Sequence, residues 1–115
     1  MKFTHYNFPG PVADIEWGPE FKWIDRCKLE LTYKDYQNEL VKIVFIDVLG
    51  VKYQCFEIGC PPDAEDSVIE FINSEWLLKL CSADNSDPQL YHRILIGFNE
   101  RGMMLEIAYK DLVRC

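Results

Sequence analysis

The sequence is poor in histidine and has fewer basic than acidic residues. These shortages argue against histidine-based metal sites and against binding to polyanions. Its 115 residues include two histidines, His5 and His92, and neither lies in HExxH or HxH spacing, so common zinc-hydrolase motifs are absent. Twelve Lys and Arg stand against nineteen Asp and Glu, which gives a net charge of −7. Nonspecific binding to nucleic acid or to an anionic membrane surface is therefore disfavoured.

Long apolar runs and phosphate-binding loops are also missing. No stretch approaches the ~18 apolar residues that a membrane helix needs. The first ten residues contain Lys2 but no apolar run after it, so we expect no secretory signal. The six glycines are scattered and form neither GxSxG nor a Walker A loop. At 115 residues the chain is expected to form a single domain, residues 1–115.

Cysteine is present in an odd number, five, with no CxxC pair. A disulfide scaffold would show an even count, and a structural zinc site would show close ligand pairs. We therefore expect reduced, mostly buried thiols in a cytoplasmic protein, with a terminal thiol exposed. No metal site and no cofactor are predicted. The cysteines are Cys27, Cys55, Cys60, Cys81 and Cys115.

Alternating hydrophobicity predicts a three-stranded meander in the first half of the chain. Residues 27–34 alternate with period two, 35–38 are a polar turn, 40–48 are rich in Val, Ile and Phe, and 51–58 form the third strand. A two-residue loop at Leu49-Gly50 sets Asp47 opposite Lys52 and Lys42 opposite Glu57. A four-residue turn before it pairs Lys34 with Glu39 and Arg26 with Asp47.

A hairpin is predicted at the end of the chain, with residues 99–102 as its loop between 91–98 and 103–110. This register pairs Phe98 with Met103, Ile94 with Ile107 and His92 with Tyr109. One face of the hairpin is then apolar except for His92, and the other is half polar, which is typical of a sheet covered on one side.

The remaining segments complete the expected fold. Residues 67–72 favour a short strand over the start of a helix, and Ser74 is a good N-cap for a short helix over 74–80 that would lie on the sheet. Residues 82–88 are expected to be a solvent loop. Residues 1–24 mix aromatics with Pro and Gly and are predicted to be irregular, before a β-rich core of 25–115. We predict an α+β domain of about six mainly antiparallel strands with one short helix.

His92 is the main candidate for catalysis. As a general base it would work with Tyr91, Tyr109 or Glu106, but the hairpin register points Glu106 to the opposite face. A hydrogen-bonded histidine at a sheet end explains the same pattern without catalysis. We therefore assign no catalytic residues.

Acidic residues are concentrated in one third of the chain. Residues 57–87 contain eight acids and one base, and the rest of the chain is neutral. Such a surface would steer a basic partner, although solvated loops in an acidic protein explain it too. The partner-binding candidates are Asp63, Glu65, Asp66, Glu70, Glu75, Asp84 and Asp87.

Several short segments together resemble small uncharacterised bacterial proteins similar to the immunity proteins of polymorphic toxin systems. The likeness covers about residues 21–112. It rests on Trp23-Ile24-Asp25, Leu29/Leu31, 41–48, Ser74-Glu75-Trp76-Leu77, Tyr91-His92-Arg93-Ile94 and Leu105-Glu106-Ile107-Ala108. The resemblance implies a protein without catalytic residues that binds and blocks a cognate toxin, often through an acidic surface.

Three functions follow as hypotheses. The first is a non-enzymatic cytoplasmic domain that binds a basic protein, such as a toxin. The second is a small hydrolase or ligand-binding domain that uses His92. The third is a homodimeric module joined through an edge strand.

Overall fold

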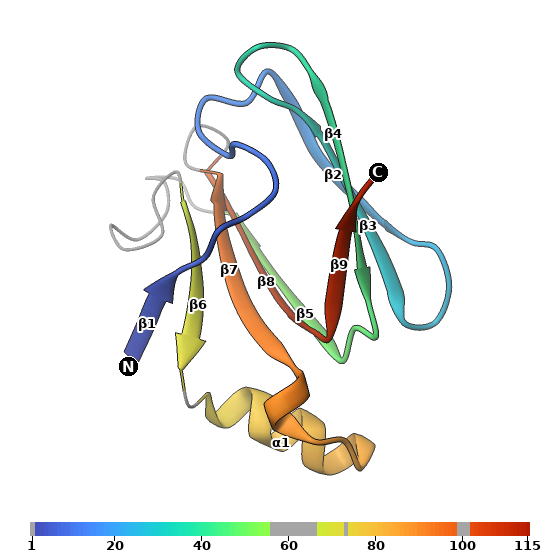
Figure 1. Cartoon of the computed structure of the whole chain (residues 1–115). Coiled ribbons are helices and arrows are strands. Elements are labelled where there is room, and N and C mark those ends of the chain that lie inside the picture. Colours follow the sequence, from blue (N-terminus) through green and yellow to red (C-terminus); the bar gives the residue numbers. More distant parts are fainter. Residues whose placement is uncertain (1, 56–66, 73, 99–101) are drawn as a thin grey trace.

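The structure is a computed structural model and describes residues 2–55, 67–72, 74–98 and 102–115. Two β-sheets meet at an angle, and one helix lies across the end of the larger sheet (Figure 1). The elements are β1 (Lys2–His5), β2 (Trp17–Trp23), β3 (Lys28–Lys34), β4 (Leu40–Ile46), β5 (Gly50–Cys55), β6 (Val68–Ile72), α1 (Glu75–Asp84), the 3₁₀ turn η2 (Pro88–Leu90), β7 (His92–Phe98), β8 (Met103–Tyr109) and β9 (Asp111–Arg114).

Both sheets are antiparallel. The larger has the strand order β1-β6-β7-β8-β5, and the smaller has the order β2-β3-β4-β9. The predicted α+β class, mainly antiparallel β-sheet with one helix, is confirmed, but the described residues form nine strands where about six were expected. The core lies between the sheets, where alternate residues of β3 and β4, such as Leu31 and Ile43, are fully buried against Ile94 and Ile107.

The predicted meander is wrong at its second turn. Leu49-Gly50 is not a hairpin loop, because β5 pairs with β8 and β4 pairs with β9. Residues 40–55 instead run alongside 103–114, and both segments bend together at a corner from one sheet into the other. Asp47 stands at this corner in the left-handed region, with φ 55°, and a bend of this kind is how strands switch sheets. The expected pairing of Asp47 with Lys52 therefore does not form.

The first turn of the meander forms, but its register is one residue off. Lys34 pairs with Leu40 instead of Glu39, and Lys28 pairs with Ile46, so Arg26 is not the partner of Asp47. The buried Asp35 carboxylate accepts hydrogen bonds from the backbone N–H groups of Gln37 and Glu39, which adds a residue to the loop. Asn38 supplies the positive φ that this longer turn requires.

The C-terminal hairpin has the predicted register. His92 pairs with Tyr109, Ile94 with Ile107 and Phe98 with Met103. Residues 67–72 contribute the expected strand, β6, which pairs with β7. The register and the strand are confirmed, because the apolar face of the hairpin fixes the pairing. The expectation that only one face is covered is wrong, since Arg93, Leu95, Met104 and Ala108 on the second face are buried as well.

Helix α1 begins as predicted and ends later. The Ser74 hydroxyl accepts a hydrogen bond from the Leu77 N–H, the expected N-cap. The helix then continues through residues 82–84, which were expected to be loop, and ends at Asn85 in the left-handed conformation. Gly50 lets the helix lie close to the sheet, because an added Cβ would stand 2.9 Å from Cδ1 of Leu80.

The N-terminal segment is less irregular than the sequence suggests. Within residues 2–24, strands β1 and β2 each form the edge of a sheet, and residues 6–16 between them are irregular. There Phe8 stacks on Phe45, and Val12 and Ile15 are buried in the core. Strand β2 could not be predicted from its sequence, because Pro19 and a shift of register between Trp17 and Glu20 interrupt the alternation of apolar and polar residues.

The hydroxyl of Tyr33 lies in the core and has no hydrogen-bond partner among the residues that the structure describes. Its side chain is fully buried, and burial raises the pKa of its phenol well above the usual range. Since an unsatisfied buried hydroxyl costs about 1–3 kcal/mol, replacing Tyr33 by Phe is expected to raise the free energy of unfolding by about 1 kcal/mol. Urea denaturation measures this, and a loss of stability would show that the hydroxyl has a partner in solution.

Among the described residues, no helix is long and apolar enough to cross a membrane.

Candidate functional site

The predicted acidic residues do not form one continuous patch. Asp63, Glu65 and Asp66 lie outside the described residues. Of the others, Glu70 lies on strand β6, Glu75 occupies the first turn of α1, and Asp84 and Asp87 lie at its opposite end. Of these four residues, the structure therefore brings together only Asp84 and Asp87. Both are close enough to the buried Cys81 to raise the pKa of its thiol, although burial is the larger cause of that rise.

Glu70 contacts His92, the histidine that was considered for catalysis. Its Oε2 lies 2.5 Å from Nδ1 of His92, across neighbouring strands of the larger sheet. The His92 ring also packs 5.5 Å from the ring of Tyr109, whose hydroxyl donates to that of Tyr6. Of the partners weighed for His92, only Tyr109 is beside it. Glu70 was expected to bind a partner protein and not His92, because the two residues are 22 positions apart and meet only when β6 pairs with β7.

Glu106 points to the other face of the sheet, as the hairpin register predicts. There its Oε2 accepts hydrogen bonds from Nε and Nη2 of Arg93 at 3.0 and 2.7 Å. The same guanidinium donates to the hydroxyl of Ser74, the N-cap of α1, and lies over the rings of Phe71 and Trp76. Arg93 is only 7% exposed. This cluster fixes the helix to the sheet and is structural in character.

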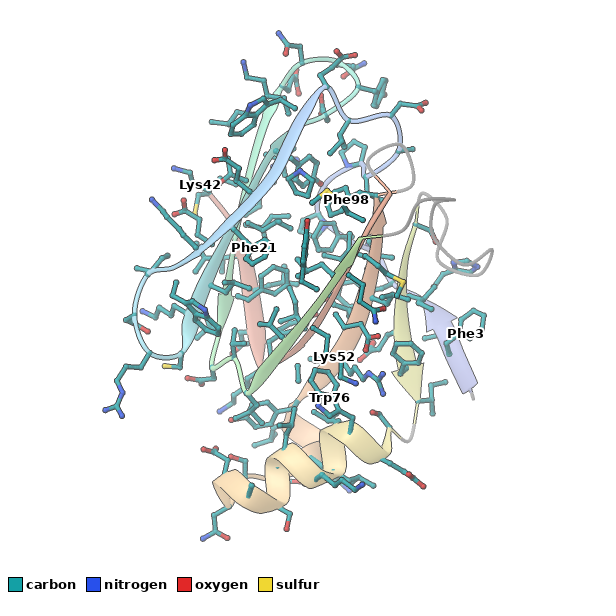
Figure 2. The ribbon with its side chains drawn as sticks, turned by 180° about the vertical axis from the view of Figure 1, so that it is seen from behind. Phe3, Phe21, Lys42, Lys52, Trp76 and Phe98 are labelled. Carbon is teal, nitrogen blue, oxygen red and sulfur yellow. The ribbon has the colours of Figure 1, made fainter. Side chains whose placement is uncertain are left out.

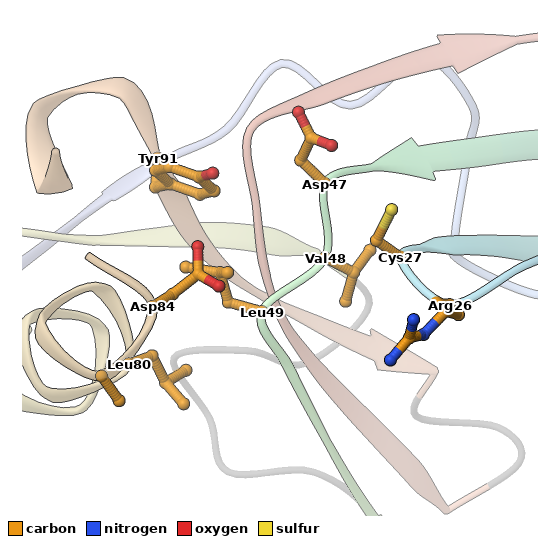
Figure 3. A pocket seen from close by; sticks show the side chains of 9 residues that line it. Arg26, Cys27, Asp47, Val48, Leu49, Leu80, Asp84 and Tyr91 are labelled. Carbon is orange, nitrogen blue, oxygen red and sulfur yellow. The ribbon is translucent and has the colours of Figure 1, made fainter. Parts of the chain in front are cut away.

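A cleft opens where the sheet corner meets the end of α1 (Figure 3). Its volume is about 480 Å³. Three segments that are distant in sequence converge on it: the β2–β3 turn, the β4–β5 corner, and the end of α1 with the residue before β7. The lining residues are Arg26, Cys27, Asp47, Val48, Leu49, Leu80, Ala83, Asp84 and Tyr91.

The cleft combines apolar walls with carboxylates. Leu49, Leu80 and the ring of Tyr91 belong to the apolar cluster that holds α1 on the sheet. Asp47 comes from the corner and Asp84 from the last turn of α1. The last turn has no basic residue, although a helix C-terminus carries partial negative charge and is stabilised by cations. Asp84 therefore adds negative charge at the helix end of the cleft, while Asp47 lies across the cleft beside Cys27, on the side where Arg26 lies (Figure 3).

The thiol in the cleft is not activated. Cys27 is exposed and free, but partial desolvation and the Asp25 carboxylate raise the pKa of its thiol. A neutral thiol is a poor nucleophile at pH 7. Within the described ranges no three His, Cys, Asp or Glu side chains are grouped as a metal site requires. Cys81 is buried and Cys115 is exposed, as expected, but Cys27 is exposed where a buried thiol was expected. The side chains of Cys55 and Cys60 lie outside what the structure describes.

The chain was compared with protein-family models, with curated proteins and with solved structures. None of them matches it.

Sequence reasoning found Asp84 in this site but not Asp47 or Tyr91. Asp47 was assigned to a regular strand, and its position depends on the left-handed bend at the corner. The signal available in the sequence was the polar Asp47 at the end of an apolar run, just before Leu49-Gly50. Tyr91 reaches the cleft only because α1 and η2 bring the chain back to the corner before β7.

Proposed function

We propose that this chain is a non-enzymatic cytoplasmic protein-binding domain that recognises a basic protein, and that the corner cleft receives a Lys or Arg side chain of that partner. The observation that carries the proposal is the pairing of two carboxylates, Asp47 and Asp84, with an apolar and aromatic wall in one hollow. Carboxylates bind the cationic group, and the wall covers the methylene stem of the same side chain.

The electrostatics of α1 support this partner. Asp84 and Asp87 destabilise the C-terminal end of the helix because no cation offsets them in its last turn. A basic side chain from outside supplies the missing charge. An immunity-type role, in which the partner is a toxin, agrees with the resemblance noted above. The contribution of Asp63, Glu65 and Asp66 to association rate stays a prediction.

The hydrolase alternative receives less support. His92 is not among the residues that line the cleft. Its Nδ1 is occupied by Glu70, and Tyr91 belongs to the cleft on the other side of the sheet. The thiol of Cys27 is in the cleft, but its raised pKa opposes nucleophilic catalysis. Binding is thus the function that this geometry serves best.

An NMR titration with a defined probe tests where a basic side chain binds. The probe is a short capped glycine peptide with one central arginine, and the control is the same peptide with citrulline, which keeps the shape but not the charge. We expect arginine-dependent amide shifts at Leu49, Leu80, Ala83 and Tyr91. Shifts of equal size for both peptides, or shifts spread over all surface acids, would contradict the proposal.

A further inference from the structure

Strand β2 is an open edge of the smaller sheet. It pairs with β3 on one side, and within the described part of the chain no strand pairs with its other side. Glu20, Phe21, Lys22 and Trp23 are all exposed, and β2 lies beside β5, the edge of the other sheet, on the near side of Figure 2. An exposed edge with aromatic residues is a template for pairing with another strand.

The backbone of β2 presents hydrogen-bonding groups away from β3. The N–H of Ile24 donates to the carbonyl of Lys28 at 2.9 Å, so Ile24 faces β3. Because successive residues of an antiparallel strand face alternate sides, the N–H and C=O groups of Phe21 and Trp23 point outward. An added strand would find donors and acceptors at both positions.

The side chains of β2 are complementary to a second, antiparallel copy of themselves. Around a twofold axis at Phe21, Glu20 stands opposite Lys22 of the second copy, and Lys22 stands opposite its Glu20. Both residues lie on the solvent face, where Lys22 is 72% exposed and reaches Glu30 at 3.7 Å. A lysine in an edge strand normally prevents pairing, but here the symmetry brings it to a carboxylate.

The other face of β2 supplies aromatic contact. Phe21 is 38% exposed and its ring lies 5.3 Å from that of Tyr53 on β5. In the twofold arrangement Phe21 meets Phe21 of the second copy, and Trp23, 52% exposed, lies across from Pro19. Aromatic cross-strand pairs stabilise such a ladder. Proline lacks the N–H for one ladder bond in each copy, which keeps the association weak.

We propose that the chain forms a weak homodimer through antiparallel pairing of β2 with β2 of a second copy, with Phe21 at the twofold axis. The two smaller sheets then join into one sheet across the axis. This interface is carried by edge geometry and charge complementarity and does not use Asp47 or Asp84. It therefore stands or falls independently of the cleft.

Sedimentation of charge-reversed variants tests the register directly. We expect the wild-type mass to rise with concentration from 13.5 kDa towards twice that value. Glu20→Lys and Lys22→Glu each place like charges opposite one another twice, and each should raise the dimer dissociation constant about tenfold or more. The double variant restores both pairs and should return the constant to near the wild-type value. Mixing the two single variants should give a heterodimer.

The matched control is Lys28→Glu, which reverses a charge on the adjacent strand β3 and should leave dimerisation unchanged. Circular dichroism verifies that each variant is folded. If Lys22→Glu is unfolded by repulsion from Glu30, the dissociation constant of the Glu20→Lys variant alone tests the register. A wild-type chain that stays at 13.5 kDa into the millimolar range overturns the proposal. A dimer indifferent to both single reversals, hence formed through another surface, overturns it as well.

Discussion

Replacing Arg93 by Leu is expected to lower the free energy of unfolding by about 3–5 kcal/mol, the range found when one partner of a buried ion pair is removed. The substitution leaves Glu106 without its counter-charge in a site where its side chain is 14% exposed. It also removes the hydrogen bond to Ser74 and the packing of the guanidinium between Phe71 and Trp76. Urea denaturation measures the change.

The control for Arg93→Leu is an ion pair at the surface. Lys22 and Glu30 lie 3.7 Å apart with Lys22 mostly in solvent, so Lys22→Leu should cost less than about 1 kcal/mol. Removing both charges in Arg93→Leu/Glu106→Leu should recover part of the lost stability, because no buried charge is left alone. If Arg93→Leu costs no more than Lys22→Leu, the cluster does not hold α1 on the sheet.

Neutralising both carboxylates of the cleft, with Asp47→Asn and Asp84→Asn together, is expected to weaken binding of the arginine peptide at least tenfold. Hydrogen bonds to charged groups contribute about 1.5–3 kcal/mol each, and solvent at the mouth of the cleft reduces that amount. The salt dependence of the remaining binding should also flatten. Calorimetry or NMR titration at two ionic strengths measures both effects.

A matched variant separates the cleft from general surface charge. Glu16→Gln/Glu39→Gln removes the same charge from exposed positions outside the cleft. It should leave the affinity for the arginine peptide near the wild-type value. If both double variants weaken binding equally, the peptide responds to net charge and not to a site.

Local sequence patterns predicted those parts of the fold in which the apolar residues of two neighbouring strands allow only one pairing. The hairpin from His92 to Tyr109 was predictable because an apolar face on both strands excludes a one-residue slip. The N-cap at Ser74 was predictable because its hydroxyl acts within one turn. The corner at Asp47 was not, since a Leu-Gly pair after an apolar strand fits both a hairpin turn and a bend between sheets.

The candidate site was harder to predict than the fold because it is assembled from distant segments. Asp84 was expected to bind a partner, but it lines the same cleft as Asp47 because α1 packs against the corner at Gly50. The same limit applies to His92, whose partner Glu70 lies on another strand. The distribution of charge along the sequence identified acidic residues as candidates. It could not show that Asp47 lies at a corner between two sheets, which follows from the pairing of β4 with β9 and of β5 with β8.

Exchange of the charge on both sides of the interaction tests the central claim most directly. The dissociation constants of the arginine peptide and of its glutamate counterpart are measured for the wild type and for Asp47→Lys/Asp84→Lys. The account predicts that the wild type prefers the arginine peptide and that the reversed variant prefers the glutamate peptide. A reversed variant that is folded and keeps the wild-type preference would contradict recognition of a basic side chain in this cleft.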